Sequence, residues 1–119
     1  MKNKQFQMYV FAVIASLFIG ISFISCKSAH AEKSSTFKVY GNCEMCKKTI
    51  ETALDTEGIY YSDWNKDSKM INVKYDSTMY SLDQIHVLIS NAGYDTETTR
   101  ATEEAYMGLE ECCQYERPM

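Results

Sequence analysis

The spacing of apolar residues between Thr36 and Thr98 limits the fold more than any other feature of this chain. Apolar residues that alternate with polar ones are typical of strands, and apolar residues three or four positions apart are typical of a helix with one buried face. Both patterns occur in this stretch, in alternation. Strands are predicted around Phe37 and Val39, at Ile59–Trp64, across Ile71, Val73 and Tyr75, and at Tyr94–Thr98.

Two helices are predicted between these strands. The first begins near Glu44 and ends at Gly58. In the second, Ser81 and Gln84 form a capping box and Gly93 closes the helix. The apolar face of the first helix is Cys46, Ile50, Ala53 and Leu54, and that of the second is Leu82, Ile85, Leu88, Ile89 and Ala92.

The predicted order of elements is βαββαβ, with a hairpin loop at residues 65–68 between the second and third strands. This order gives an antiparallel four-stranded sheet with both helices on one face, the α+β arrangement called ferredoxin-like. The core residues predicted from the same pattern are Val39, Ile50, Leu54, Ile71, Val73, Leu82, Ile85 and Ile89.

Residues 1–25 have the pattern of an export signal, because two lysines precede an uncharged run at residues 8–24. The Phe-Ile-Ser-Cys sequence that ends at Cys26 resembles a bacterial lipobox, in which the signal is cleaved before a cysteine that then carries lipid. We therefore expect Cys26 to be lipidated and the protein to be an exported periplasmic or outer-membrane lipoprotein. An uncleaved membrane anchor stays open, although a run of 17 residues is short for a bilayer core of about 30 Å.

The composition of residues 26–119 indicates where the domain lies and which functions are excluded. Residues 26–35 are predicted to be a polar tether, residues 36–99 the domain, and residues 100–119 a tail that the fold does not require. Without residues 1–25 the chain has 10 basic and 16 acidic residues and a net charge of −6. Nucleic-acid affinity comes mainly from Lys and Arg, so we expect no nucleic-acid partner. The sequence has no Ser-His-Asp set, phosphate loop or spaced carboxylate pair that would indicate an enzyme.

Cys43 and Cys46 form a Cys-x-x-Cys sequence between the first strand and the first helix. One cysteine lies in the loop and the other on the first helical turn, so both sulfurs can face one point. Thiolates select soft ions, and a two-cysteine site suits Cu(I) or Hg(II) better than Zn(II), which normally takes four ligands. The helix N-terminus and the neighbouring Lys47 and Lys48 are expected to lower the pKa values of the thiols and to offset the charge of a complex.

Residues 36–98 resemble the heavy-metal-associated domain family, which includes copper chaperones, the N-terminal domains of copper-pumping ATPases and periplasmic mercury-binding proteins. The resemblance rests on the Cys-x-x-Cys sequence, on Val-Lys-Tyr-Asp at residues 73–76 and on Asn-Ala-Gly-Tyr-Asp at residues 91–95. It implies that Cys43 and Cys46 bind one soft ion and pass it by ligand exchange to a partner, such as a metal-transporting ATPase or an efflux protein.

The resemblance also implies a role for Tyr94, which matches a tyrosine beside the metal loop in bacterial members. The chain departs from the family pattern at Gly41-Asn42-Cys43, which is one residue shorter than Gly-Met-x-Cys and lacks the methionine that packs beneath the loop. Met45, between the two cysteines, does not obviously replace it.

The predicted function is therefore capture, buffering or transfer of Cu(I) at the cell envelope, and Hg(II) or Zn(II) binding or sensing is the alternative. A thiol-disulfide function in the envelope also stays open, although a thioredoxin-like site needs a cis-proline opposite the cysteines and the only proline is Pro118. Adjacent cysteines rarely bridge each other, so Cys112 and Cys113 are either auxiliary metal ligands or an unused pair. His30, in the tether, and His86, at the border of the second helix's apolar stripe, are not predicted to be ligands.

Overall fold

The structure is a computed structural model that describes residues 4, 5, 7–11 and 31–119. Residues 4, 5 and 7–11 are helical. Cys26 and most of the predicted signal segment lie outside the described residues, so lipidation stays a prediction. Among the residues described, no helix combines the length and the apolar character needed to cross a bilayer.

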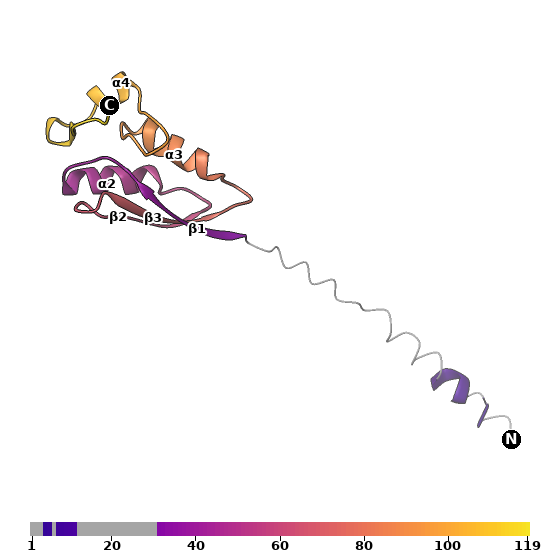
Figure 1. The fold of residues 1–119 in the computed structure, drawn as a ribbon. Helices are drawn as coiled ribbons and strands as arrows, with labels where there is room; N and C mark the ends of the chain where they lie inside the picture. Colours follow the sequence, from indigo (N-terminus) through magenta and orange to yellow (C-terminus); the bar gives the residue numbers. More distant parts are fainter. Residues whose placement is uncertain (1–3, 6, 12–30) are drawn as a thin grey trace.

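Residues 31–119 form an antiparallel sheet whose three strands lie in the order β1-β3-β2, and both longer helices cover one face of it (Figure 1). The ferredoxin-like fold class predicted from the sequence is confirmed. The elements are β1 (Glu32–Lys38), α2 (Glu44–Ala53), β2 (Ile59–Trp64), β3 (Met70–Asp76), α3 (Leu82–Asn91), α4 (Glu103–Met107) and the 3-10 helix η1 (Glu111–Cys113).

Two boundaries of the sheet differ from the prediction. β1 begins at Glu32 rather than near Thr36, so the end of the predicted tether pairs with β3. The predicted fourth strand is reduced to one isolated bridge between Val39 and Thr96. The backbone turns immediately afterwards, because the Thr96 amide donates to the Thr99 carbonyl at 2.8 Å and the ladder cannot continue.

Local signals placed the starts of both helices and the hairpin correctly, although α2 ends at Ala53 rather than at Gly58. Cys43 is the N-cap of α2, as expected for a helix that begins at Glu44. The capping box of α3 is present, with the Ser81 hydroxyl and the Gln84 side chain each accepting a backbone N–H of the other residue. Gly93 follows α3 at a φ of 102°, which only glycine adopts without strain.

The core lies between the sheet and the two helices and contains all the predicted residues except Leu82, which is 37% exposed at the first position of α3. Trp64 and Tyr94 are fully buried and are its largest side chains. His86 is buried. Its ring lies 4.0 Å from that of Phe37, and its Nδ1 atom is 2.6 Å from the Thr96 hydroxyl, so its role is packing.

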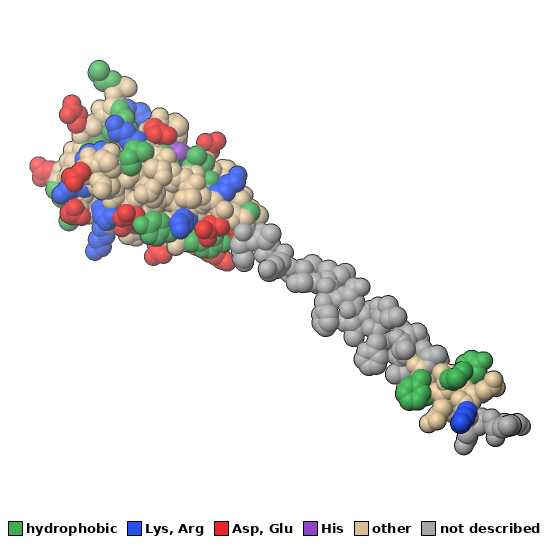
Figure 2. Space-filling model, turned by 60° about the horizontal axis from the view of Figure 1, so that its bottom comes forward, with side chains coloured by type: hydrophobic (Ala, Val, Ile, Leu, Met, Phe, Trp, Pro, Cys, Tyr) green, Lys and Arg blue, Asp and Glu red, His purple; other side chains and the backbone are tan. Residues whose placement is uncertain are grey.

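Acidic, basic and hydrophobic side chains are interspersed over the face of the domain that Figure 2 shows. On this face the two charge signs alternate rather than gather, which limits its long-range attraction for a highly charged partner.

Candidate metal centre

The loop that carries the first two cysteines is positioned by Trp64 beneath it. The Trp64 indole N–H donates to the Val39 carbonyl at 3.0 Å, which fixes the ring under the end of β1. A Cβ atom on Gly41 would lie 3.0 Å from this ring and 3.2 Å from the Cβ of Cys46, so only glycine fits here without displacing a neighbour. The tryptophan ring thus packs directly against the loop at Gly41.

Cys43 and Cys46 converge as the sequence predicts, with their sulfurs 3.2 Å apart. The Cys46 amide donates to the Cys43 sulfur at 3.4 Å, which orients the N-cap side chain over the helix start. Asn42 makes two hydrogen bonds with the Cys46 sulfur. Its backbone N–H donates to Cys46 Sγ at 3.4 Å, and its side-chain Oδ1 accepts from the Cys46 thiol at 3.1 Å. Cys46 is fully buried, and Cys43 is half-buried.

The tail brings two more thiols to the same loop. Cys113 Sγ lies 3.6 Å from Cys43 Sγ, and Cys112 Sγ lies 3.9 Å from Cys113 Sγ. The sulfurs of Cys43, Cys112 and Cys113 all lie within 4.8 Å of one another. Cys113 is 1% exposed, whereas Cys112 is open to solvent. All four described cysteines are free thiols and form one cluster.

These separations can be compared with those that a metal ion imposes. An ion that binds sulfur at about 2.3 Å places its ligands about 3.8 Å apart in a tetrahedron, about 4.0 Å apart in a trigonal plane and about 4.6 Å apart in a line. The sulfur of Cys43 is 3.2 Å from that of Cys46 and 3.6 Å from that of Cys113. Small rotations would reach three- or four-coordinate geometry, and a linear pair requires the largest movement. Cys112 and Cys113, which the sequence analysis kept open as auxiliary ligands, are therefore close enough to Cys43 to be considered with the first two thiols.

Aromatic packing holds the tail against the core. The buried Tyr115 ring stacks on Tyr94 at a centroid distance of 5.7 Å and meets Tyr106 edge-on at 5.2 Å. Its hydroxyl accepts from the Asp95 amide at 2.7 Å and donates to the Gly93 carbonyl at 3.1 Å. Because Tyr115 lies two residues after Cys113, this anchor fixes the position of the third thiol.

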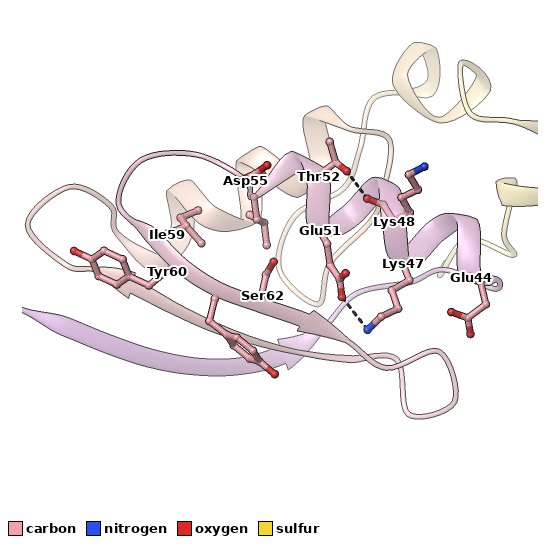
Figure 3. Close-up of a pocket in the computed structure, with 11 residues that line it drawn as sticks. Glu44, Lys47, Lys48, Glu51, Thr52, Asp55, Ile59, Tyr60 and Ser62 are labelled. Atoms are coloured by element: carbon pink, nitrogen blue, oxygen red, sulfur yellow. Dashed lines mark hydrogen bonds and ion pairs between the residues drawn. The ribbon is translucent and has the colours of Figure 1, made fainter.

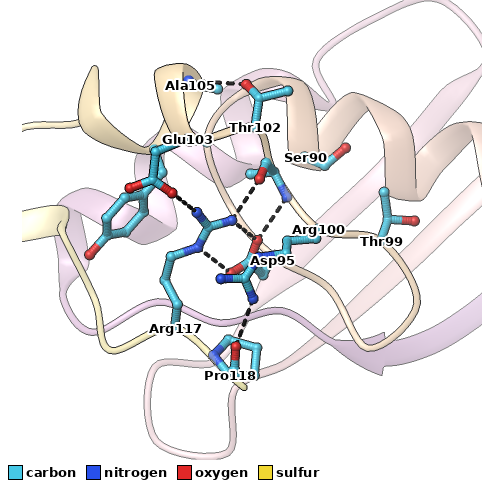
Figure 4. A network of polar contacts seen from close by, with 12 residues as sticks. Ser90, Asp95, Thr99, Arg100, Thr102, Glu103, Ala105, Arg117 and Pro118 are labelled. Atoms are coloured by element: carbon cyan, nitrogen blue, oxygen red, sulfur yellow. Dashed lines mark hydrogen bonds and ion pairs between the residues drawn. The ribbon is translucent and has the colours of Figure 1, made fainter.

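A buried ion pair between Arg117 and Asp95 completes the attachment (Figure 4). Arg117 Nε donates to one carboxylate oxygen at 2.8 Å and Nη2 donates to the other at 2.6 Å, and the Asp95 side chain is 1% exposed. Arg117 also donates to the Ala101 carbonyl at 2.6 Å and to Glu103 at 2.9 Å. The tail is thus packed against the domain, and its cysteines lie at the metal loop.

Sequence reasoning overlooked Tyr115 and Arg117, although a signal for them exists. Cys113, Tyr115 and Arg117 recur at every second position, as side chains on one face of an extended segment do. Cys113 and Tyr115 are buried and Arg117 faces the buried Asp95.

The two lysines after the cysteines do not serve the thiols as expected. Lys47 lines the groove between α2 and β2, where its ammonium contacts Glu51 at 2.8 Å (Figure 3). The same ammonium contacts Asp63 at 2.5 Å. It also donates to the Trp64 carbonyl at 2.8 Å. Two carboxylates therefore balance its charge and raise its pKa, while Lys48 is exposed to solvent.

Burial and hydrogen bonding give the thiols different acidities. Burial acts to raise the pKa of Cys43, but hydrogen bonds from the side chain and backbone of Cys46 outweigh it and lower the pKa. Burial raises the pKa of Cys113 to about 12. Burial also raises the pKa of Tyr94, and the adjoining Cys46 and Cys113 thiols raise it further. The Tyr94 hydroxyl thus stays protonated beside the sulfurs, and it has no hydrogen-bond partner in the described part of the chain.

No protein-family model and no curated protein matches this sequence. Solved structures do match. A CopZ metallochaperone is 29% identical, with a TM-score of 0.51 over 54% of this chain and 98% of that one. Oxidized MerP from Ralstonia metallidurans CH34 is 25% identical, with a TM-score of 0.53 over 56% of this chain and 96% of that one.

A further structural match shows the fold alone. The N-terminal domain of a potential copper-translocating P-type ATPase from Bacillus subtilis, in its Cu(I)-loaded state, is 22% identical. Its TM-score is 0.52 over 55% of this chain and 84% of that one. These structural neighbours are heavy-metal-associated domains, the family that the sequence resembles.

Proposed function

We propose that the protein binds Cu(I) through Cys43 and Cys46, with Cys113 as a third ligand, and that it buffers or transfers the ion at the cell envelope without catalytic turnover. The observation that carries this proposal is the convergence of four free thiols on one strand-to-helix loop. The structural likeness to a CopZ metallochaperone supports it. Thiolate ligands favour Cu(I) over hard cations.

The ligands differ in solvent exposure, and this difference separates a role in metal transfer from a role in metal retention. Cys46 and Cys113 are at most 1% exposed, and Cys43 is partly open. A partner that offers its own thiolates would meet Cys43 before the buried sulfurs, so ligand exchange would start there. The buried ligands and the Tyr94 hydroxyl, which can donate to a thiolate, would retain the ion until exchange is complete.

The N-terminal sequence supports the proposed cell-envelope location, and a structural likeness supports the proposed partner. The export signal and the lipobox-like sequence at Cys26 favour an exported lipoprotein held at the membrane by its lipid. A metal-transporting ATPase or an efflux protein is the proposed partner, since a copper-translocating ATPase contains a domain of this fold. Zn(II) is the alternative ion, because it also takes thiolate ligands and the sulfurs of Cys43, Cys112 and Cys113 lie within 4.8 Å of one another.

The test is anaerobic competition for Cu(I) between a colorimetric chelator and the full chain, made by cell-free synthesis in mild detergent. Cys43→Ser and Cys46→Ser should each lower the affinity at least about tenfold, because each removes a ligand. Cys26→Ser, a cysteine change elsewhere in the chain, is the matched control. Unchanged affinity in both site variants would refute the assignment, and preferential retention of Zn(II) would favour the alternative.

A further inference from the structure

A fifth sulfur lies at the outer edge of the thiol cluster. Met45, on the first turn of α2, is 48% exposed. Its Sδ atom lies 3.8 Å from the sulfur of Cys112, a residue of η1 that is also open to solvent. The two residues are 67 positions apart in the sequence, so only the docked tail brings them together.

The five sulfurs form a continuous row from the buried core to the surface. Successive separations are 3.2 Å from Cys46 to Cys43, 3.6 Å to Cys113, 3.9 Å to Cys112 and 3.8 Å to Met45. The last two separations match the value of about 3.8 Å for two sulfurs on one tetrahedral ion with bonds of about 2.3 Å. The row holds more sulfurs than the four that such an ion binds.

We propose that the protein holds a second Cu(I) ion, bound by Met45 and Cys112 and sharing the Cys113 thiolate with the inner ion. This rests on the proposed function, in which the inner ion is bound by Cys43, Cys46 and Cys113. A thioether is a soft, neutral ligand that suits Cu(I) and not Zn(II), so Met45 selects for copper at the outer position.

The charges around the cluster also favour a second cation. Three thiolates around one Cu(I) carry a net charge of −2, and the charge of the neighbouring Lys47 is already balanced by Glu51 and Asp63. A fourth thiolate from Cys112 would add a further negative charge. A second Cu(I) ion cancels that charge, and the neutral Met45 adds a ligand without adding to the repulsion.

The test is an anaerobic titration of the full chain with Cu(I) supplied as its acetonitrile complex, with a chelator reporting free copper. The parent is expected to bind two equivalents tightly, and the Met45→Leu, Cys112→Ser double variant one. Met45→Leu alone should weaken only the second equivalent, by roughly tenfold. Met79→Leu is the matched control, because Met79 is 47% exposed and contacts the Gly58 region instead.

X-ray absorption at the copper edge gives an independent readout. A copper–copper scattering path should appear in the parent at two equivalents and disappear in the double variant. Both changed side chains are exposed, and unchanged thermal unfolding of the metal-free variants would show that the fold is intact.

One tight equivalent in the parent, or two in the double variant, would overturn the second site. Failure of the proposed function is distinguishable, because the parent would then bind no more copper than a variant with serine at positions 43, 46, 112 and 113.

Discussion

Substitution of Arg117 tests whether its ion pair with Asp95 holds the tail, and with it Cys113, at the metal site. Replacing Arg117 with methionine keeps an aliphatic side chain of similar length but removes the guanidinium group, whose carbon lies 4.8 Å from the centroid of the Tyr106 ring. The substitution removes both hydrogen bonds to the Asp95 carboxylate, which is 1% exposed and keeps only the Ala101 amide, at 2.7 Å, among its close donors.

The magnitude follows from this burial. Removing one partner of a buried ion pair costs about 3–5 kcal/mol, because the remaining charge loses its compensation. The retained amide donor places the expected cost near the lower end, at about 3 kcal/mol. Residues 100–119 contribute no strand to the sheet, so we expect the loss to appear first as undocking of the tail. A cost of about 3 kcal/mol corresponds to a roughly 100-fold rise in the undocked population.

Alkylation of Cys113 measures this population, since the thiol is 1% exposed and reacts only when the tail opens. The experiment uses the reduced, metal-free full chain with Cys112→Ser as background, and mass spectrometry locates the label. Arg100→Met is the matched control, because Arg100 also lies in the tail but binds only the exposed Pro118 carbonyl, at 2.7 Å. Equal Cys113 labelling rates in the parent and in Arg117→Met would refute the argument that this ion pair holds the third ligand in place.

Other predictions concern the loop, the hydroxyl, the ion pair and the N-terminus. Gly41→Ala should weaken Cu(I) binding by roughly tenfold in chelator competition, because its Cβ would press on the Trp64 ring at 3.0 Å; unchanged affinity would mean that the loop yields freely. Tyr94→Phe removes an unpartnered buried hydroxyl, so the metal-free domain should unfold no more easily while Cu(I) leaves several-fold faster in stopped-flow transfer to a chelator. Burial would raise the pKa of Asp95, but its hydrogen bonds with Arg117 and the Ala101 amide lower it. The resulting stability should be complete above the unfolded pKa of about 3.9 and should be lost as the pH falls through the lower folded value; urea unfolding that keeps the same midpoint from pH 5 to pH 2 would contradict this. Mass spectrometry of the processed protein should show an acylated Cys26 at the N-terminus, and an intact segment 1–25 would show a protein anchor instead.

The fold could be predicted because its signals are local. The capping box at Ser81 and Gln84, the glycine after α3 and the alternation across Ile71 and Val73 each act within a few residues of sequence. The fourth strand could not be predicted in the same way. Its ladder stops at a turn in which the Thr96 hydroxyl, 2.6 Å from His86 Nδ1, also accepts from the Thr98 and Thr99 amides at 3.3 Å and 3.1 Å, and alternation of apolar residues does not reveal such a turn.

The first two thiols of the site could also be predicted, since Cys43 and Cys46 lie on one turn and face each other through local geometry alone. The position of Cys113 could not, because it depends on Tyr115 and Arg117 reaching buried partners on the far side of α3. The predicted effect of Lys47 on the thiols failed for the same reason, because the direction of its side chain depends on a residue distant in the sequence. Its side chain is equally able to reach toward the thiols or the sheet, and Asp63 on β2 decided the direction.

Retention and transfer of a metal ion make opposite demands, and the docked tail connects them. Retention improves with each buried sulfur, and Cys113 supplies one only while the tail is docked. Transfer requires that an incoming ligand displace these sulfurs in turn, and Cys113 is the one whose support can be withdrawn without unfolding the sheet. Under the proposed function, the Arg117–Asp95 pair therefore sets the rate of transfer as well as the strength of retention. Loosening the pair should speed copper transfer to an acceptor and weaken equilibrium retention together, whereas losing Cys43 should weaken retention and also remove the exposed sulfur through which exchange begins.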